Sequence, residues 1–437
     1  MTDPRARPDL LAAPDGPDLA SLQTRTVTTL MSSQVMGGVG VASGIAVAAL
    51  MAAEISGRDD LSGLANTTQV LGGALMTIPV AALMAAYGRR AGLVTAYLVG
   101  TVGAVLAITA AVIGHFWLLL LGTALFGASS TANSQARYAA VDLAPPTRRG
   151  RHLSLVVWAT TIGSVLGPNI LGPGQALADA LGLPPLAGAW VFSAAGFLVA
   201  ALLIHLLLRP DPLVTARALA DHGAPTGPRV GQRGSVLHGL RAILASPVAR
   251  LGTLAVTAGH VVMVAVMVMT PIHMSHGHAE VEVIGFVISI HILGMYGLSP
   301  VAGYLTDRWG ARPVIVTGAV IQVVACVLAA TSRTGWSLGL LAGLFLLGLG
   351  WSCTMVAGSN LVAAGSEVRD RASVQGASDL VMGLSAAAAG GLAGVVVQHL
   401  GYDWLGGAGA AVALLLAVGT VASARRARSP QGRAPAR

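Results

Sequence analysis

Apolar segments of about 20 residues recur along almost the whole chain, and this pattern limits the fold more than any other feature. A helix of that length spans the roughly 30 Å hydrocarbon core of a bilayer. Only 10% of the residues are charged, whereas soluble domains have about 25%. The sequence therefore predicts an all-α membrane protein with twelve transmembrane helices, at approximately 27–54, 62–86, 91–113, 115–140, 153–173, 186–208, 250–271, 283–304, 313–332, 336–362, 374–398 and 404–423.

The arginines indicate how the helices are oriented. All 26 basic residues are Arg, and with the amino terminus inside, 23 of them lie on the inner side. Only Arg58 and Arg333 lie outside, while Arg137 falls near the inner end of the fourth segment. The positive-inside rule then places both termini in the cytoplasm and the chain in the cytoplasmic membrane. The same bias accounts for the net charge of +8, so we predict lipid and not nucleic acid as the surroundings of the protein.

One long hydrophilic stretch, residues 209–249, separates two sets of six segments. The expected organisation is a cytoplasmic tail (1–26) with no signal peptide, a six-helix half (27–208), a cytoplasmic linker (209–249), a second half (250–424) and a tail (425–437). The halves also repeat each other, because GYLTDRWGAR follows the eighth segment and AALMAAYGRR follows the second. Duplicated six-helix halves are typical of alternating-access transporters.

The first of these repeats resembles the loop motif of the major facilitator superfamily, G-x-L-x-D-R-x-G-x-R. The resemblance implies the major facilitator fold, in two six-helix halves, and a latch in which the acid and the arginines hold cytoplasmic helix ends together in one conformation. In the first half, Ala85 and Ala86 replace the expected Asp and Arg, so a latch there must be weaker or use Arg89 and Arg90 alone. The matching residues are Gly303, Leu305, Asp307, Arg308, Gly310 and Arg312.

Soft and nitrogen donors are concentrated in the seventh and eighth segments. Met263 and Met267 are four residues apart, as are His291 and Met295, so each pair lies on one helix face. With the two helices antiparallel, both pairs reach the same depth near the bilayer midplane. Thioether and imidazole ligands suit Cu(I) better than hard divalent ions. The alternative is that the methionines fill the core and the histidine is structural.

This combination resembles the CcoA-like copper importers of bacteria, a branch of the superfamily. The resemblance implies that Met263, Met267, His291 and Met295 bind copper as transported substrate, with no cofactor and with an intracellular copper acceptor as a candidate partner. The branch also includes relatives associated with riboflavin. Uptake of such a molecule therefore stays an alternative to copper.

Further polar residues have candidate roles. In the outer loop, His273, Met274, His276 and His278 could collect metal, or they could simply be solvated. Proton coupling could use His260, Glu54 or Asp379, because an ionisable side chain within a membrane segment is a functional candidate. Arg137 with Asp142, together with Asp379, is expected to form gating or structural ion pairs near the inner helix ends.

Other functions find less support in the sequence. GSVLGPNILG, residues 163–172, is similar to a pattern associated with proton-coupled drug export, so export of a drug or metabolite stays open. An enzyme is not expected, because there is no second histidine cluster, phosphate-binding loop or Ser/His/Asp arrangement. We therefore predict a copper importer, with a carrier of a small organic molecule as the alternative.

Overall fold

The computed structural model describes residues 18–58, 61–166, 170–221 and 235–428, and all regular structure in these ranges is helical. The parts of the two predicted tails that lie in 1–17 and 429–437, and residues 222–234 of the predicted linker, are outside the described residues. The first half comprises α1 (Leu19–Ser56), α2 (Gly63–Tyr87), α3 (Arg89–Ile113), α4 (Phe116–Ala139), α5 (Arg149–Leu166), α6 (Leu171–Leu181) and α7 (Ala187–Leu207), with the 3₁₀ turn η3 (Pro146–Arg148) before α5.

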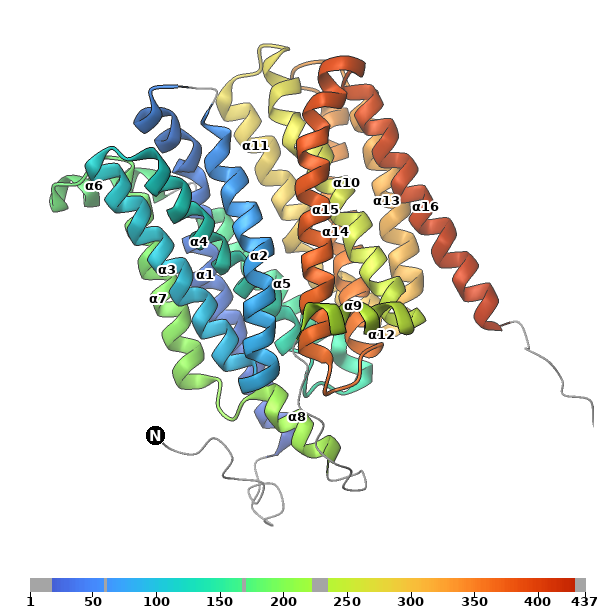
Figure 1. The fold of residues 1–437 in the computed structure, drawn as a ribbon. Helices are drawn as coiled ribbons and strands as arrows, with labels where there is room; N and C mark the ends of the chain where they lie inside the picture. The colour runs from blue at the N-terminus through green and yellow to red at the C-terminus, as the bar shows by residue number, and fades with distance from the viewer. Residues whose placement is uncertain (1–17, 59–60, 167–169, 222–234, 429–437) are drawn as a thin grey trace, which may run out of the picture.

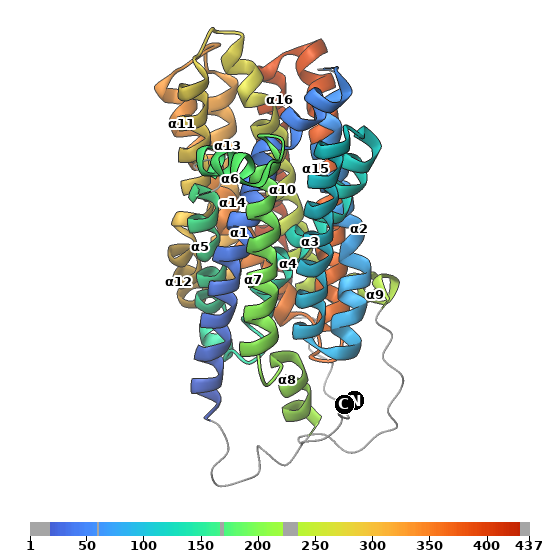
Figure 2. The same ribbon diagram turned by 90° about the vertical axis from the view of Figure 1, so that its left-hand side faces the viewer.

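The second half comprises α10 (Pro247–Ser275), α11 (Val281–Ile292), the π-helical turn η5 (Leu293–Gly297), α12 (Ser299–Trp309), α13 (Ala311–Ala330), α14 (Leu338–Ala364), α15 (Arg371–Leu400) and α16 (Tyr402–Arg428). Two short helices, α8 (Pro212–Asp221) and α9 (Val236–Ala245), join the halves. The two sets of helices stand side by side, and α8 and α9 lie toward one end of them (Figures 1 and 2). Eleven helical spans in the described ranges are long and apolar enough to cross a membrane, with α11, η5 and α12 counted together as one span.

The predicted fifth segment, 153–173, corresponds to two helices and not to one. The first is α5, which is described as far as Leu166, and the second is α6, which begins at Leu171. Residues 167–169 lie outside the described part of the chain. Pro173 falls in the first turn of α6, where a missing N–H breaks no intrahelical hydrogen bond.

The predicted eighth segment, 283–304, is also interrupted. It consists of α11, the π-helical turn η5 and α12, and it extends to Trp309. Pro300 lies in the first turn of α12 and cannot donate a backbone hydrogen bond, so the helix restarts after the π turn. Met295 lies within this turn, whereas His291 lies in regular helix.

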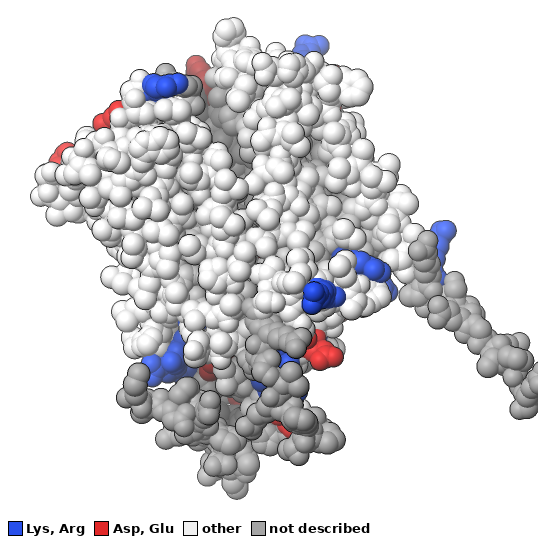
Figure 3. Space-filling model, in the orientation of Figure 1, with Lys and Arg blue, Asp and Glu red and all other residues white. Residues whose placement is uncertain are grey.

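Figure 3 shows arginines toward both ends of the bundle. The end that holds Arg89 at the start of α3, Arg149 at the start of α5, Arg308 near the end of α12 and Arg371 at the start of α15 is called the Arg-rich end. Two repeated helix ends lie there, Gly88 after α2 and Gly310 after α12. Their φ angles are +92° and +87°, a region that favours glycine. The repeated Gly in the AALMAAYGRR and GYLTDRWGAR segments therefore has a shared backbone role.

Each half has its own apolar core. In the first half, Phe126 packs between Trp190 and Phe197, with ring centroids 5.0 Å away in both cases. In the second half, Met263, Met269 and Met295 are among the buried side chains of the main cluster. Each half therefore buries its own apolar side chains, and polar side chains can lie at the interface between the halves.

Candidate functional site

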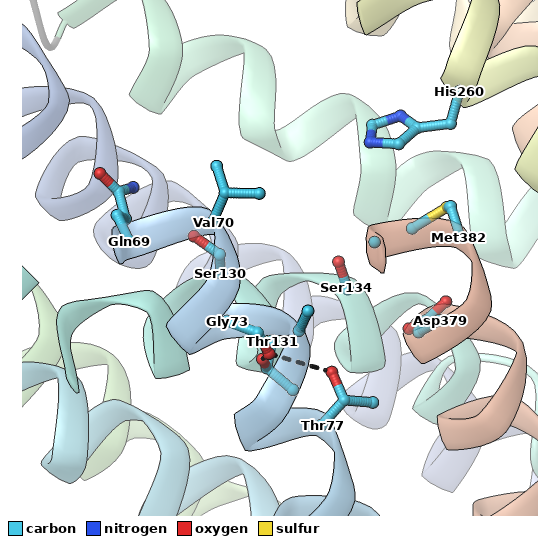
Figure 4. A pocket seen from close by; sticks show the side chains of 12 residues that line it. Gln69, Val70, Gly73, Thr77, Ser130, Thr131, Ser134, His260, Asp379 and Met382 are labelled. Atoms are coloured by element: carbon cyan, nitrogen blue, oxygen red, sulfur yellow. Dashed lines mark hydrogen bonds between the residues drawn. The ribbon is translucent and has the colours of Figure 1, made fainter. Parts of the chain in front are cut away.

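A polar cavity lies between the two halves (Figure 4). It has a volume of about 160 Å³ and is lined by α2 and α4 of the first half and by α10 and α15 of the second. Such a position between helix bundles is a common place for a ligand site. The polar residues and the one sulfur-bearing residue that line it are Gln69, Thr77, Ser130, Thr131, Ser134, His260, Asp379 and Met382.

Some of the hydroxyl groups in this cavity are already bonded to the backbone and others are not. The hydroxyls of Thr77 and Thr131 both donate to the carbonyl of Gly73, at 3.1 and 2.7 Å. The hydroxyls of Ser130 and Ser134 have no hydrogen bond within the described ranges and face the cavity (Figure 4). The two serine hydroxyls are therefore available to a bound molecule, whereas the two threonine hydroxyls are already hydrogen-bonded to the backbone of α2.

Asp379, which lines this cavity, belongs to an ion pair between the halves. The guanidinium of Arg137, on α4, pairs with the carboxylate of Asp379, on α15, and both side chains are buried. Gln135 donates a second hydrogen bond to Asp379 at 2.8 Å, and Arg137 donates to the hydroxyl of Ser359 at 3.1 Å. Two helices of the second half, α14 and α15, are thereby joined to α4.

The expected pairing of Arg137 with Asp142 is not found. Asp142 lies beyond the last residue of α4, Ala139, and accepts from Nε of Arg89 at 2.8 Å. It also accepts through its backbone carbonyl from Arg371 at 3.1 Å. Because the chain turns away after α4 ends, Arg137 and Asp142 point to different partners.

Arg89, in the first-half repeat AALMAAYGRR, makes hydrogen bonds to both halves. It is fully buried at the start of α3 and donates to Asp142, Gln135 and Gln375. Gln375 lies on α15, so this bond crosses between the halves. A buried arginine therefore joins the halves next to the positions where Ala85 and Ala86 replace the motif's Asp and Arg. Gln375 carried no sequence signal beyond being a polar residue in an apolar helix.

The acidic residue of the second-half motif contacts the other half in a different way from the one expected. The carboxylate of Asp307, on α12, accepts from the backbone N–H groups of Gly150 and Arg151 at 2.7 and 2.9 Å. These groups open α5, where the helix dipole favours a negative charge. In the described part of the chain, Asp307 therefore binds a helix amino terminus of the other half and no guanidinium.

The other motif residues have separate roles. A Cβ on Gly303 would lie 2.0 Å from Ser154 Oγ and 2.5 Å from the carbonyl of Gly150, so the glycine allows α12 to approach α5. Arg308 donates to the exposed hydroxyl of Tyr304 at 2.9 Å. Nε of Arg312 is buried and has no hydrogen bond in the described residues.

The four predicted copper ligands are distributed over three elements. Met263 and Met267 are on α10, His291 is on α11 and Met295 is in η5. Helix α14 packs against all three elements. The Nδ1–H group of His291 donates to the carbonyl of Leu344, on α14, at 2.8 Å, and its Nε2 is buried with no hydrogen bond in the described residues.

The outer-loop donors differ in their environments. His273 is buried, stacks on Tyr402 with a centroid distance of 4.1 Å and hydrogen-bonds to Ser332 at 3.2 Å. Met274 is fully buried, whereas His276 and His278 are exposed. Of the candidate coupling residues, Glu54 is exposed near the end of α1, while His260 and Asp379 line the cavity.

Two helical bundles with a polar cavity between them are the architecture of membrane carriers of the alternating-access class. The chain belongs to the Major Facilitator Superfamily, whose family model matches residues 26–281 and 254–437. Members of this family are carriers and not enzymes, and they need no cofactor.

Similar proteins are transporters of the same type. The chain is 35% identical over 407 residues to the uncharacterized MFS-type transporter YddS of Bacillus subtilis, covering 90% of each chain. It is 35% identical over 398 residues to YdeG of the same organism, covering 91% of each. It is 27% identical over 392 residues to the riboflavin transporter RfnT of Brucella anthropi, covering 88% of this chain and 93% of the relative.

Solved structures share the fold. The human organic anion transporter MFSD10 matches with a TM-score of 0.70 at 16% identity, over 91% of this chain and 99% of its own. The transporter FucP in the outward conformation matches with a TM-score of 0.66 at 14% identity, over 90% and 98%. At these identities the likeness concerns the fold alone.

Proposed function

We propose that this protein is a secondary transporter that moves a small polar organic molecule inward across the cytoplasmic membrane. The observation that carries the proposal is the cavity between the halves, to which α2, α4, α10 and α15 all contribute. A site shared by two rigid halves is exposed to one side or the other as the halves rock against each other. The positive-inside rule then assigns the Arg-rich end to the cytoplasm, with both termini on that side.

The contacts between the halves support a conformation that is closed at the Arg-rich end. Asp307 with α5, Arg89 with Gln375, and Ser299 with the carbonyl of Ser154 at 3.1 Å are all cross-half contacts there. The surface is hollowed between the halves at the opposite end (Figure 3). Substrate would reach the cavity from that side, and release into the cytoplasm would require these contacts to break.

The lining of the cavity favours an organic substrate with several hydrogen-bonding groups. Free hydroxyls of Ser130 and Ser134 and the imidazole of His260 surround it, with only one sulfur atom, in Met382. A volume of about 160 Å³ is below the roughly 300–1,000 Å³ of pockets for drug-sized ligands, so in this conformation it would accept one end of a larger molecule. The similarity to a riboflavin transporter makes riboflavin the first probe to test.

Copper, as Cu(I), is the second candidate substrate, and one observation favours it. With Nδ1–H donating to Leu344, the buried Nε2 of His291 carries a lone pair that no hydrogen bond uses. Neutral imidazole with its other nitrogen fixed by a carbonyl is the usual form of a metal ligand. Met263, Met267 and Met295 are the proposed further ligands, and an intracellular copper acceptor would then be a partner.

Uptake measurements distinguish the two substrates. Cells with and without the protein are compared for saturable accumulation of labelled riboflavin and, separately, for total copper by mass spectrometry. The proposal predicts flavin accumulation that rises with expression and unchanged copper content. Copper accumulation that rises with expression, without flavin uptake, would replace the organic substrate by the metal. A fall in labelled flavin with expression would indicate export.

Variants assign any copper uptake to the proposed ligands. His291→Leu and Met267→Leu should abolish copper accumulation if copper is the substrate, while the protein stays in the membrane. Met51→Leu is the matched control, because Met51 is buried in the core of the first half, away from these residues. Copper uptake that survives both ligand variants would remove the metal assignment.

A further inference from the structure

The imidazole of His260, in the cavity, is held in one tautomer by Trp351, a residue that has no role in the transport proposal. The indole Nε1–H of Trp351, on α14, donates to Nδ1 of His260, on α10, at 2.9 Å. An indole N–H can only donate, so Nδ1 must be the accepting, unprotonated nitrogen. In a neutral imidazole the proton then has to be on Nε2.

The local packing keeps this pair together. A Cβ on Gly259 would lie 2.1 Å from Thr354 Oγ1, so the glycine next to His260 allows α10 to approach α14. Gln322, on α13, donates to the carbonyl of Gly259 at 2.8 Å and fixes the backbone at this point. The buried ring of Trp351 is packed edge-on against Tyr296, with centroids 5.5 Å apart. The indole therefore has little freedom to release the imidazole.

The other ring nitrogen faces the ligand site. Figure 4 shows the imidazole extending from α10 into the cavity, above Ser134 and Asp379. In the described residues, Nε2 of His260 has no hydrogen-bond partner, whereas Asp379 is already bonded to Arg137 and Gln135. A fixed, unpaired N–H group in a cavity is a donor for a ligand atom.

We propose that His260 is a substrate-recognition residue that donates from Nε2 to a carbonyl or anionic oxygen of the substrate, and that Trp351 is the positioning residue that sets this tautomer. The proposal rests on the organic-substrate function above. It also argues against His260 as a proton carrier. A proton added at Nδ1 would face the indole N–H, and two donors cannot satisfy each other.

The tautomer can be tested without any substrate. Purified protein carrying ¹⁵N-labelled histidine is compared by NMR with the His260→Gln variant, and the difference assigns the two ring nitrogens of His260. We expect an unprotonated Nδ1 and a protonated Nε2 at neutral pH, and a mixture of tautomers in Trp351→Phe. An unprotonated Nε2, or a spectrum that Trp351→Phe leaves unchanged, would overturn the proposal. Trp404→Phe, at an exposed tryptophan, is the matched control.

The recognition role is tested with labelled riboflavin as the probe. Loss of one such hydrogen bond should raise KM about tenfold in His260→Leu with kcat little changed. His260→Gln, whose amide N–H reaches the position of Nε2, should restore most of the affinity, and Trp351→Phe should raise KM by less than His260→Leu. A KM unchanged in His260→Leu would refute the recognition role. If the unaltered protein takes up no riboflavin, the proposed function fails, and the NMR experiment alone decides whether the Trp351–His260 arrangement exists.

Discussion

Arg137 and Asp379 lie 242 positions apart in the chain and form a buried ion pair between the two halves, directly beside the cavity. Gln135 and Ser359 satisfy further polar atoms of the pair. Any motion that separates α4 from α15 must break this ion pair. The pair therefore connects the ligand site to the interface that moves.

Removing one member of the Arg137–Asp379 pair should destabilise the protein strongly. Either Arg137→Gln or Asp379→Asn leaves an uncompensated buried group, and we expect the free energy of unfolding to fall by about 3–5 kcal/mol. The double variant should lose clearly less than the sum of the two single variants. Thermal unfolding of the purified protein in detergent measures all three, and strictly additive losses would contradict the pairing.

Adding a methyl group at Gly303 should open the Arg-rich end. In Gly303→Ala the new Cβ would meet the rigid backbone carbonyl of Gly150 at 2.5 Å, so α12 must move away from α5. Overpacking of this kind costs about 1–3 kcal/mol, enough to shift the balance between conformations. Spin labels at Thr147→Cys and Pro313→Cys should report a longer distance across this end.

The control for this experiment is Gly339→Ala. A Cβ at Gly339 would meet nothing within 4 Å, so its helix keeps its position. The distance between the two spin labels in this variant should equal the distance in the protein that keeps Gly303 and Gly339. A distance that is the same in Gly303→Ala would show that the close approach of α12 and α5 does not hold this end closed.

Neutralising Asp307 should weaken the same closure without adding bulk. Asp307→Asn loses the charge that faces the amino terminus of α5, which is worth up to about 2 kcal/mol in a partly buried position. In the background Ser154→Cys, at a buried position, Asp307→Asn should make alkylation of the new thiol about 5–30 times faster, since the closed conformation is less populated. Arg308→Gln is the control, because Arg308 bonds to the exposed Tyr304, and its alkylation rate should not change.

Replacing Arg89 by lysine should destabilise the protein. The guanidinium of Arg89 reaches Asp142, Gln135 and Gln375 at once, whereas an ammonium group is a single point charge on a flexible chain. We expect Arg89→Lys to lower thermal stability and to show a coupling energy of about 0.5–3 kcal/mol with Gln375→Leu in a double-mutant cycle. Arg90→Lys is the neighbouring control. A coupling energy near zero would show that Arg89 and Gln375 do not stabilise each other.

The four predicted copper ligands show what residue spacing can predict and what it cannot. Equal spacing correctly places Met263 with Met267 on one helix, but it cannot describe the π turn that contains Met295. Nor can it show that α14 packs against both α10 and α11, or that His291 donates to Leu344. Those features depend on how three helices pack, and the assignment of the four ligands stays a prediction.

The ion pairs show the same limit. The sequence identifies Arg137, Asp142 and Asp379 as charged groups near the inner helix ends, but it pairs Arg137 with its neighbour in the chain. The structure pairs it with a residue of the other half. Which charges meet depends on the rotation of each helix and on how the halves dock, and neither is encoded in local spacing.

The sequence by itself determined the class of fold, because a bilayer requires apolar segments of a fixed length and arginine strongly prefers one side of it. It also revealed the repeated segments AALMAAYGRR and GYLTDRWGAR and the family's loop motif, since each can be read from a short run of residues. Only the tertiary structure decided that Asp307 binds the amino terminus of α5, that Arg89 reaches Gln375 and that Trp351 holds His260. These contacts join residues far apart in the chain, and their geometry exists only after the helices have packed.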